Sequence, residues 1–355
     1  MDRKATKALF ESSGKTDFER GNNLGKRIVE GIKNKKIREA DISIRMLHEE
    51  VTTSAFPIIL GQVLFYMFLK AYQEAPGIGD KLTTLYTSKV TDEKMPIAEG
   101  KSTIREVKES EPYPHTGMIT ERYVELSSAK RGEILDITEE TIMEDRTGLI
   151  MRAAQQYGKW LKADKEVNIL STIQDLTGYK AWYPAGSQAA LYSTGTTAPH
   201  FCSNQITNAL ANYTDLDAAY KLMGNMFHTS DKKVPIIVRP KYLLVPVALE
   251  TTAKRLIKNS VNPGFANNEV NPFANMSEVL SSPHLDVNST INWFWGDFQE
   301  QFLWKEVIPL QIIQRPPNTG DDYERDVKYS YKFRYKGGCG AIDHRQVIKS
   351  TGASS

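Results

Sequence analysis

Residues 325–350 read RDVKYSYKFRYKGGCGAIDHRQVIKS. Within them, four aromatic residues alternate with four polar or basic residues: Tyr329, Tyr331, Phe333 and Tyr335 against Ser330, Lys332, Arg334 and Lys336. Successive side chains of a strand point to opposite faces of a sheet, so this period predicts one aromatic and one basic face. A platform for single-stranded nucleic acid would need its aromatics exposed beside the charges, and we expect these to be buried instead. The glycines after Lys336 predict a break before a second strand.

A second aromatic segment lies just upstream, where INWFW and QFLWKEVIPLQII in 291–313 predict two strands around a turn at Gly296-Asp297. A core explains only half of these aromatic side chains, because alternate residues of a strand face opposite ways. Buried aromatic anchors are typical of interface hot spots. Core alone and core plus interface therefore both stay open, and Trp293, Trp295 and Phe298 are candidate interface residues.

Helical patterns separate these strands from the start of the chain. KYLLVPVALETTAKRLI, at 241–257, predicts a strand that runs into a helix. Residues 144–172 predict a rod of about 43 Å at 1.5 Å per residue. Its apolar positions, Trp160 among them, recur at a spacing of three and four, with Arg152, Lys159 and Lys162 opposite. The run AFPIILGQVLFYMFL, at 55–69, is shorter than the roughly 20 residues of a membrane span and predicts a buried helix or strand.

Two polar segments have the character of contact surfaces. Residues 88–132 hold short β-compatible runs between prolines and glycines, which predicts a long hairpin with too few apolar residues for a core of its own. Residues 177–213 carry a single charge, Lys180. Charges are depleted at interface cores, so this stretch favours contact with protein, although a long loop would have the same composition.

Composition excludes several kinds of protein. The 355 residues include 45 Lys and Arg and 43 Asp and Glu, a net charge of +2, which argues against a dedicated nucleic-acid binder. Eleven of the cations and only six acidic residues fall in 1–40, which predicts a basic arm. Two cysteines cannot form a disulfide framework or a four-cysteine zinc site.

Catalytic motifs are weak or missing. Gly100-Lys101-Ser102-Thr103 matches only the end of a phosphate-binding loop, because Met95 stands where that motif needs glycine. Cys339 lies near Asp343 and His344, but glycines at a strand end more often mark a turn. We expect no enzyme activity, no catalytic or cofactor-binding residue, no metal site and no cofactor.

The order of these segments resembles that of tailed-bacteriophage major capsid proteins of the Hong Kong 97 type. The similarity extends over residues 50–350 and is carried by LLVPVALETTAKRLI and YKFRYKGGCGAIDHR. It implies an α+β fold with an N-terminal arm, an extended β-hairpin loop, a peripheral domain with a long spine helix, and an axial domain.

The resemblance also implies domain boundaries. The arm would be 1–50, and 51–87 the first peripheral segment. The extended loop would be 88–132, followed by the peripheral domain with its spine helix at 133–175. The axial domain would be 176–320, within which a helix at 214–232 could pack in the peripheral domain. Residues 321–355 would supply the closing strands of the peripheral domain and the tail.

A shell protein of this family would assemble as hexamers and pentamers into an icosahedral phage head around double-stranded DNA. Its partners would be copies of itself, a separate scaffolding protein, a portal, decoration proteins and the packaged DNA, bound without sequence preference, with no membrane involved. It would be located in the virion capsid after assembly in the cytoplasm of the bacterial host. An encapsulin-like nanocompartment shell and a soluble α/β enzyme are the alternatives.

Candidate side chains for these contacts lie in the predicted long hairpin, the uncharged stretch, the aromatic segment and the long helix. The candidate interface residues are Ile104, Val107, Tyr123, Trp182, Tyr183, Trp293, Trp295 and Phe298. The candidate DNA-facing residues are Arg152, Lys159 and Lys162 on the long helix.

Overall fold

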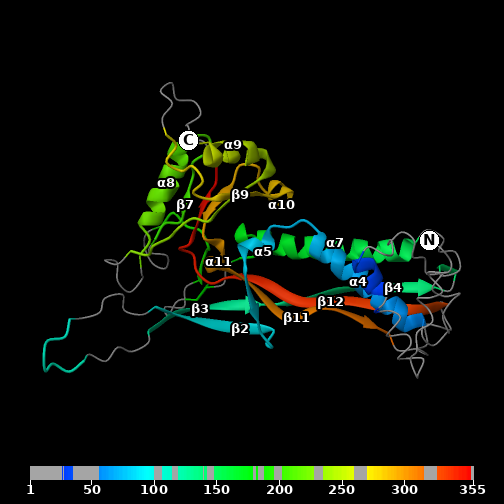
Figure 1. Ribbon diagram of the computed structural model, residues 1–355. Helices are drawn as coiled ribbons and strands as arrows, with labels where there is room; N and C mark the ends of the chain where they lie inside the picture. The colour runs from blue at the N-terminus through cyan, green and yellow to red at the C-terminus, as the bar shows by residue number, and fades with distance from the viewer. Residues whose placement is uncertain are drawn as a thin grey trace. The chain divides into compact units, whose positions relative to one another are not determined.

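A computed structural model describes most of the chain (Figure 1). The described residues are 26, 28–34, 56–99, 106–113, 119–138, 140–141, 148–178, 181–182, 188–195, 202–227, 235–259, 270–315 and 326–352. They divide into two compact units. Unit 1 takes its described residues from 1–77, 130–165 and 308–336, and unit 2 takes them from 78–129, 166–307 and 337–355.

Unit 1 packs two helices on strands. Helix α4 (Phe56–Glu74) and the first part of α7 (Leu149–Ile173) lie on one side of β4 (Ala129–Thr138), β12 (Val327–Ala341) and the end of β11 (Phe302–Gln314) (Figure 1). The strand order is β11-β12-β4. The predicted aromatic face of β12 is confirmed, because Tyr331 and Phe333 are buried in a core with Leu64, Phe68 and Ile137.

The apolar run at 55–69 is confirmed as part of a buried helix, since Ile59, Leu60, Val63 and Leu64 of α4 are fully buried. No helix among the described residues is long and apolar enough to cross a membrane. The long helix is confirmed as α7, which begins at Leu149, while 144–147 lie outside the described residues. Trp160 departs from the predicted apolar stripe, because 54% of its surface is exposed.

Unit 2 contains a five-stranded sheet in the order β7-β13-β10-β8-β9. These strands are short: β7 (Gln205–Ile206), β13 (Val347–Ser350), β10 (Trp293–Gly296), β8 (Tyr242–Val245) and β9 (Glu278–Ser281). Helices α8 (Tyr213–Gly224) and α9 (Val247–Lys258) share one core with β8, β10 and β13. The strand-to-helix segment at 241–257 is thereby confirmed as β8 followed by α9.

Other elements complete unit 2. Helices α5 (Gly79–Leu82), α10 (Pro283–Asp286) and α11 (Phe298–Gln301) are single turns. Strand β1 (Thr84–Thr87) runs parallel to the first residues of β11. A four-stranded sheet has the order β2-β3-β5-β6, with β2 (Asp92–Glu99), β3 (Ile119–Ser127), β5 (Ala181–Trp182) and β6 (Gln188–Ala189).

Three expectations about connectivity are wrong. Strands β10 and β11 do not pair with each other, because β10 lies between β13 and β8 while β11 pairs with β1 and β12. Strand β13 belongs to the five-stranded sheet of unit 2. Only β12, and not all of 321–355, therefore closes the sheet that contains β4. Helix α8 ends at Gly224 and packs in the core of unit 2, since Leu216, Ala219 and Met223 contact the β8–β10 cluster.

Candidate functional site

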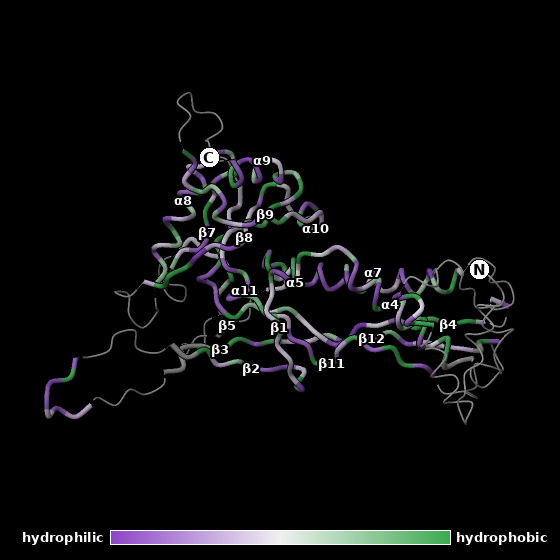
Figure 2. The backbone as a smooth tube through the Cα atoms, viewed as in Figure 1, coloured by the Kyte–Doolittle hydropathy of each residue, from purple (hydrophilic) through white to green (hydrophobic). Residues whose placement is uncertain are grey.

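Strands β2 and β3 form a long antiparallel hairpin within unit 2. Asp92 pairs with Ser127 at its base and Glu99 pairs with Ile119 at the last paired position, with a register irregularity between Ile97 and Ala98. Strand β2 is the edge of its sheet and carries Pro96, which lacks the N–H that a further strand would need. The described part of the outer turn, 106–113, is mostly hydrophilic (Figure 2).

A buried lysine anchors the base of this hairpin. Lys305, on β11, has a side chain that is only 1% exposed, and its Nζ lies 3.1 Å from Oε2 of Glu93 on β2. The same ammonium donates to the carbonyl oxygens of Leu126, at 3.3 Å, and Thr91, at 3.4 Å. One cation therefore joins both arms of the hairpin to β11.

Glu93 is the acceptor for the rest of this network. Its carboxylate accepts hydrogen bonds from the Tyr86 hydroxyl at 2.9 Å and the Ser88 hydroxyl at 2.8 Å. Hydrogen bonds from Ser88, Tyr86 and Lys305 lower the pKa of Glu93, in that order of size, because all three stabilise the ionised form. We name Tyr86, Ser88, Glu93 and Lys305 the hairpin anchor.

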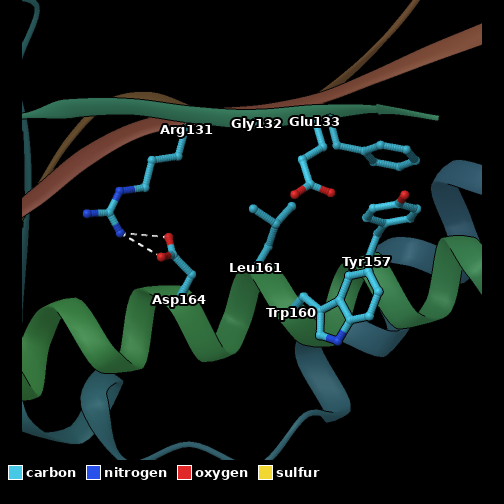
Figure 3. Close-up of a pocket in the computed structure, with 8 residues that line it drawn as sticks. Arg131, Gly132, Glu133, Tyr157, Trp160, Leu161 and Asp164 are labelled. Carbon is cyan, nitrogen blue, oxygen red and sulfur yellow. Dashed lines mark hydrogen bonds and ion pairs between the residues drawn. The ribbon is translucent and has the colours of Figure 1, made fainter.

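Unit 1 contains a separate pocket of about 230 Å³ between β4 and α7 (Figure 3). One end is closed by Arg131, whose guanidinium donates to both carboxylate oxygens of Asp164 at 2.7 and 2.8 Å. The Tyr335 hydroxyl also donates to Asp164. Burial, together with that hydrogen bond to Asp164, raises the pKa of Tyr335 well above its usual range.

Aromatic rings form the other end of the pocket. Tyr157 stacks on Phe333 with ring centroids 5.6 Å apart and meets Trp160 edge to face at 5.2 Å. Gly132 lies on β4 with no room for a side chain, since a Cβ there would be 2.2 Å from the carbonyl oxygen of Phe333. The pocket therefore opens on exposed Trp160 with its walls held by packing and by an ion pair. We call it the α7 pocket.

The hairpin contains two described interface candidates, Val107 in the outer turn and Tyr123 on β3, and both are half-buried. Lys94 lies with its Nζ 5.0 Å from the centre of the Tyr123 ring. Tyr123 pairs with Trp182 of β5 across the sheet. Ile104, Tyr183 and the side chain of Trp182 lie outside the described residues.

The other three interface candidates are corrected by the structure. Trp293, Trp295 and Phe298 are fully buried inside unit 2, so their side chains present no surface to another subunit. The indole N–H groups are satisfied internally, by the Asn208 carbonyl at 3.0 Å and the Ser277 hydroxyl at 2.8 Å. Strand β10 is a central strand, and both of its faces are covered.

Of the three basic candidates on α7, two are exposed and one is buried. Arg152 and Lys159 are exposed. Lys162 is 8% exposed and its Nζ lies 5.3 Å from the centre of the Tyr72 ring, so the expectation that it faces DNA is wrong. The helical period places 152 and 159 on one face, but 162 turns toward α4.

The described residues give no support for the metal-binding and cysteine motifs considered in the sequence. No three His, Cys, Asp or Glu side chains group there as a metal site would require. Cys202 is buried, and Asp343 is paired with Arg345 at 2.9 Å. Gly100-Lys101-Ser102-Thr103 lies outside the described residues. The sequence analysis does not predict the role of Lys305. Its position as the one lysine within the mostly apolar segment FLWKEVIPL is a signal for a buried charge.

Comparisons with known proteins point to one family. A family profile described as "Phage capsid protein" matches residues 123–350. No curated protein matches.

Several solved structures are similar. The capsid of the cyanophage P-SCSP1u aligns at 14% identity and a TM-score of 0.49, covering 79% of this chain and 89% of that chain. The mature capsid of bacteriophage PhiM1 aligns at 10% identity and a TM-score of 0.48, covering 78% and 86%. A virus-like particle from Pyrococcus furiosus aligns at 10% identity and a TM-score of 0.46, covering 81% and 98%.

Proposed function

Because the chain belongs to the phage capsid protein family, we propose that its copies assemble as hexamers and pentamers into the icosahedral head of a tailed phage around double-stranded DNA. The protein is a structural capsid protein, located in the virion capsid, that assembles with copies of itself, and it is not an enzyme. The observation that carries the proposal is the family match over well over half of the chain.

The hairpin supports a clasp between neighbouring subunits. Its base is held by the buried Lys305, while its described outer turn is polar and lacks a core of its own. A segment so anchored at one end and so poor in apolar contacts at the other gains stability from a partner. In this proposal Val107 and Tyr123 contact the neighbouring subunit, and Ile104, Trp182 and Tyr183 are further candidates for the same contact.

The domain arrangement is part of the same proposal. Residues 1–50 would be the arm, 51–87 the first peripheral segment, 88–132 the extended loop, 133–175 the peripheral domain with α7 as its spine, and 176–320 the axial domain. The remaining partners would be a separate scaffolding protein, a portal and decoration proteins, with assembly in the cytoplasm of the bacterial host.

Electron microscopy of the purified full-length protein tests the assembly. We expect rings or closed shells built from fivefold and sixfold capsomers. Protein that stays monomeric under all assembly conditions and turns over a small molecule would contradict the proposal. Closed shells that hold a cargo enzyme and no DNA would favour a nanocompartment instead.

Contact with DNA is proposed to be weak and non-specific, through exposed Arg152 and Lys159. Phosphate contacts release counterions, so binding to duplex DNA should decrease strongly between about 50 and 200 mM salt. The double variant Arg152→Gln, Lys159→Gln should reduce this salt dependence. Lys221→Gln, an exposed lysine on α8, is the control and should leave it unchanged. Binding that persists at the higher salt, or that depends on sequence, would overturn this part.

A further inference from the structure

Among the described residues, the α7 pocket contains one charged group without an internal counter-ion, Glu133. Arg131 and Asp164 neutralise each other through their paired hydrogen bonds. Glu133 is exposed and, among the described residues, takes part in no ion pair or hydrogen bond. Figure 3 shows its carboxylate pointing from β4 toward α7, above Leu161 and beside the aromatic end. The pocket therefore carries a net negative charge.

The aromatic rings reinforce this preference. Tyr157, Trp160 and Phe333 line the same pocket as Glu133. The faces of aromatic rings attract cations, most strongly for Trp, and a carboxylate adds an ion pair. Rings and a carboxylate without a counter-ion together suit a lysine ammonium or an arginine guanidinium, and disfavour an anion or a purely apolar group.

We propose that the α7 pocket receives a lysine or arginine side chain from a second copy of this chain, so that Glu133 and Trp160 form part of a contact between subunits. The inference rests on the proposed assembly into shells. Two features support a second copy as the occupant. A shell protein buries surface against its own copies, and 54% of the Trp160 surface is left exposed by its own subunit. The charge is also complementary, since the cation comes from a chain with 45 lysines and arginines.

Photo-crosslinking from position 160 tests the occupant directly. A photoreactive phenylalanine analogue replaces Trp160 in the full chain, and shells are assembled from a mixture of isotopically heavy and light protein. Mass spectrometry then separates crosslinks between copies from crosslinks within one copy. We expect heavy–light crosslinks to peptides in which the attached residue lies next to a lysine or arginine. Crosslinks only within one copy, only to another protein, or none in assembled shells would overturn the proposal.

Point variants test the chemistry. We expect Glu133→Gln and Trp160→Ala each to raise the subunit concentration needed for shell assembly about three- to tenfold, as loss of one ion pair or cation–π contact would. Trp160→Phe should restore part of the loss. The Glu133→Gln effect should shrink at high salt, because screening weakens an exposed ion pair.

Matched controls separate this contact from general surface changes. Leu149→Ala truncates an equally exposed apolar side chain of α7 outside the pocket, and Glu74→Gln removes an exposed carboxylate of the same unit. Both should leave the assembly concentration unchanged. Equal effects of the variants and their controls would overturn the proposal. Shells that form from Glu133→Gln and Trp160→Ala at an unchanged concentration would overturn the pocket contact and leave the proposed function standing.

Discussion

At the scale of single residues, the hairpin anchor contains a buried charge, that of Lys305. A lysine that is 1% exposed is stable only with a counter-charge and hydrogen bonds, because transfer of an unpaired cation from water is costly. Glu93 and two carbonyl oxygens supply these at Lys305. The three acceptors come from both arms of the hairpin, so the charge fixes the position of the hairpin base against β11.

We predict that loss of Glu93 and loss of Lys305 lower the stability of the subunit by unequal amounts. Glu93→Gln leaves the Lys305 charge buried without its counter-charge, and should lower the free energy of unfolding of the disassembled subunit by about 2 kcal/mol or more. Lys305→Met leaves Glu93 partly exposed and still bonded to Tyr86 and Ser88, so it should cost less. Urea unfolding measures both.

The Lys94–Glu125 pair is the matched control, because it lies on the same hairpin with side chains 67% and 34% exposed. Glu125→Gln should change the free energy of unfolding by no more than about 0.5 kcal/mol, as for other exposed ion pairs. Equal losses from Glu93→Gln and Glu125→Gln would contradict the importance of burial at the hairpin anchor.

The hairpin anchor also predicts a dependence on pH. The folded-state pKa of Glu93 is lowered from its ordinary 4.5, first by the Ser88 hydrogen bond and then by those from Tyr86 and Lys305. Folding therefore favours the ionised carboxylate, and this stabilisation is complete well above pH 4.5 and is lost as the pH falls through the folded-state pKa. The difference in urea midpoint between the natural protein and Glu93→Gln should shrink as the pH drops below 4.5. A constant difference down to pH 3 would be inconsistent with this linkage.

At the scale of elements, α4 and α7 meet at a glycine. A Cβ at Gly158 would lie 2.5 Å from the carbonyl oxygen of Phe68 and 3.1 Å from the amide nitrogen of Tyr72. Glycine weakens a helix interior by roughly 1 kcal/mol relative to alanine, yet here it lets two helix backbones approach closely. The close approach places Tyr157 against Phe333 and leaves Trp160 at the margin of the helix pair.

Gly158→Ala should therefore destabilise the subunit despite the better helix propensity of alanine. Overpacking of this kind costs about 1–3 kcal/mol, because the atoms in the way belong to the backbone of α4. Thermal unfolding measures the loss. Gly224→Ala is the control, since a Cβ at that position of α8 meets nothing within 4 Å, and it should be neutral or slightly stabilising. Similar stability of both variants would argue against a close helix crossing.

At the scale of the whole molecule, we expect folding and assembly to depend on different residues of the chain. The cores of both units are built from residues outside the outer part of the hairpin. All described pairing between β2 and β3 ends at Glu99 and Ile119. The outer part of the hairpin can thus change without removing a buried contact described in either core.

Replacement of residues 100–118 by a short Gly/Ser linker should leave a folded subunit that fails to build stable shells. The cut retains every described β2–β3 pair and the hairpin anchor, so the unfolding midpoint should stay unchanged while shells disappear in electron micrographs. A variant of natural length with 106–113 changed to Gly and Ser separates reach from side-chain contact. If the shortened protein unfolds, the segment contributes to a core, and if it assembles normally, the hairpin is no clasp.

Local periodicity determined much of this protein from its sequence. The alternation in β12 predicted its buried aromatic face, and the spacing in α7 predicted a helix with one apolar side. The apolar run in α4 predicted a buried helix or strand, and it is a helix. Order of segments led to the capsid family, which the family profile supports. These signals survive because they depend on side chains within one strand or helix.

Tertiary structure alone decided which strands are neighbours and which charges meet. Trp293 and Trp295 are buried because β10 is central in a sheet whose partners come from 242–245 and 347–350, and no pattern within INWFW encodes that. Lys305 meets Glu93 across 212 positions of sequence, and Glu133 faces Tyr157 only because β4 packs on α7. Burial and pairing are properties of long-range contacts, whose energies depend on where the chain returns, so a local pattern predicts an element's faces but not what covers them.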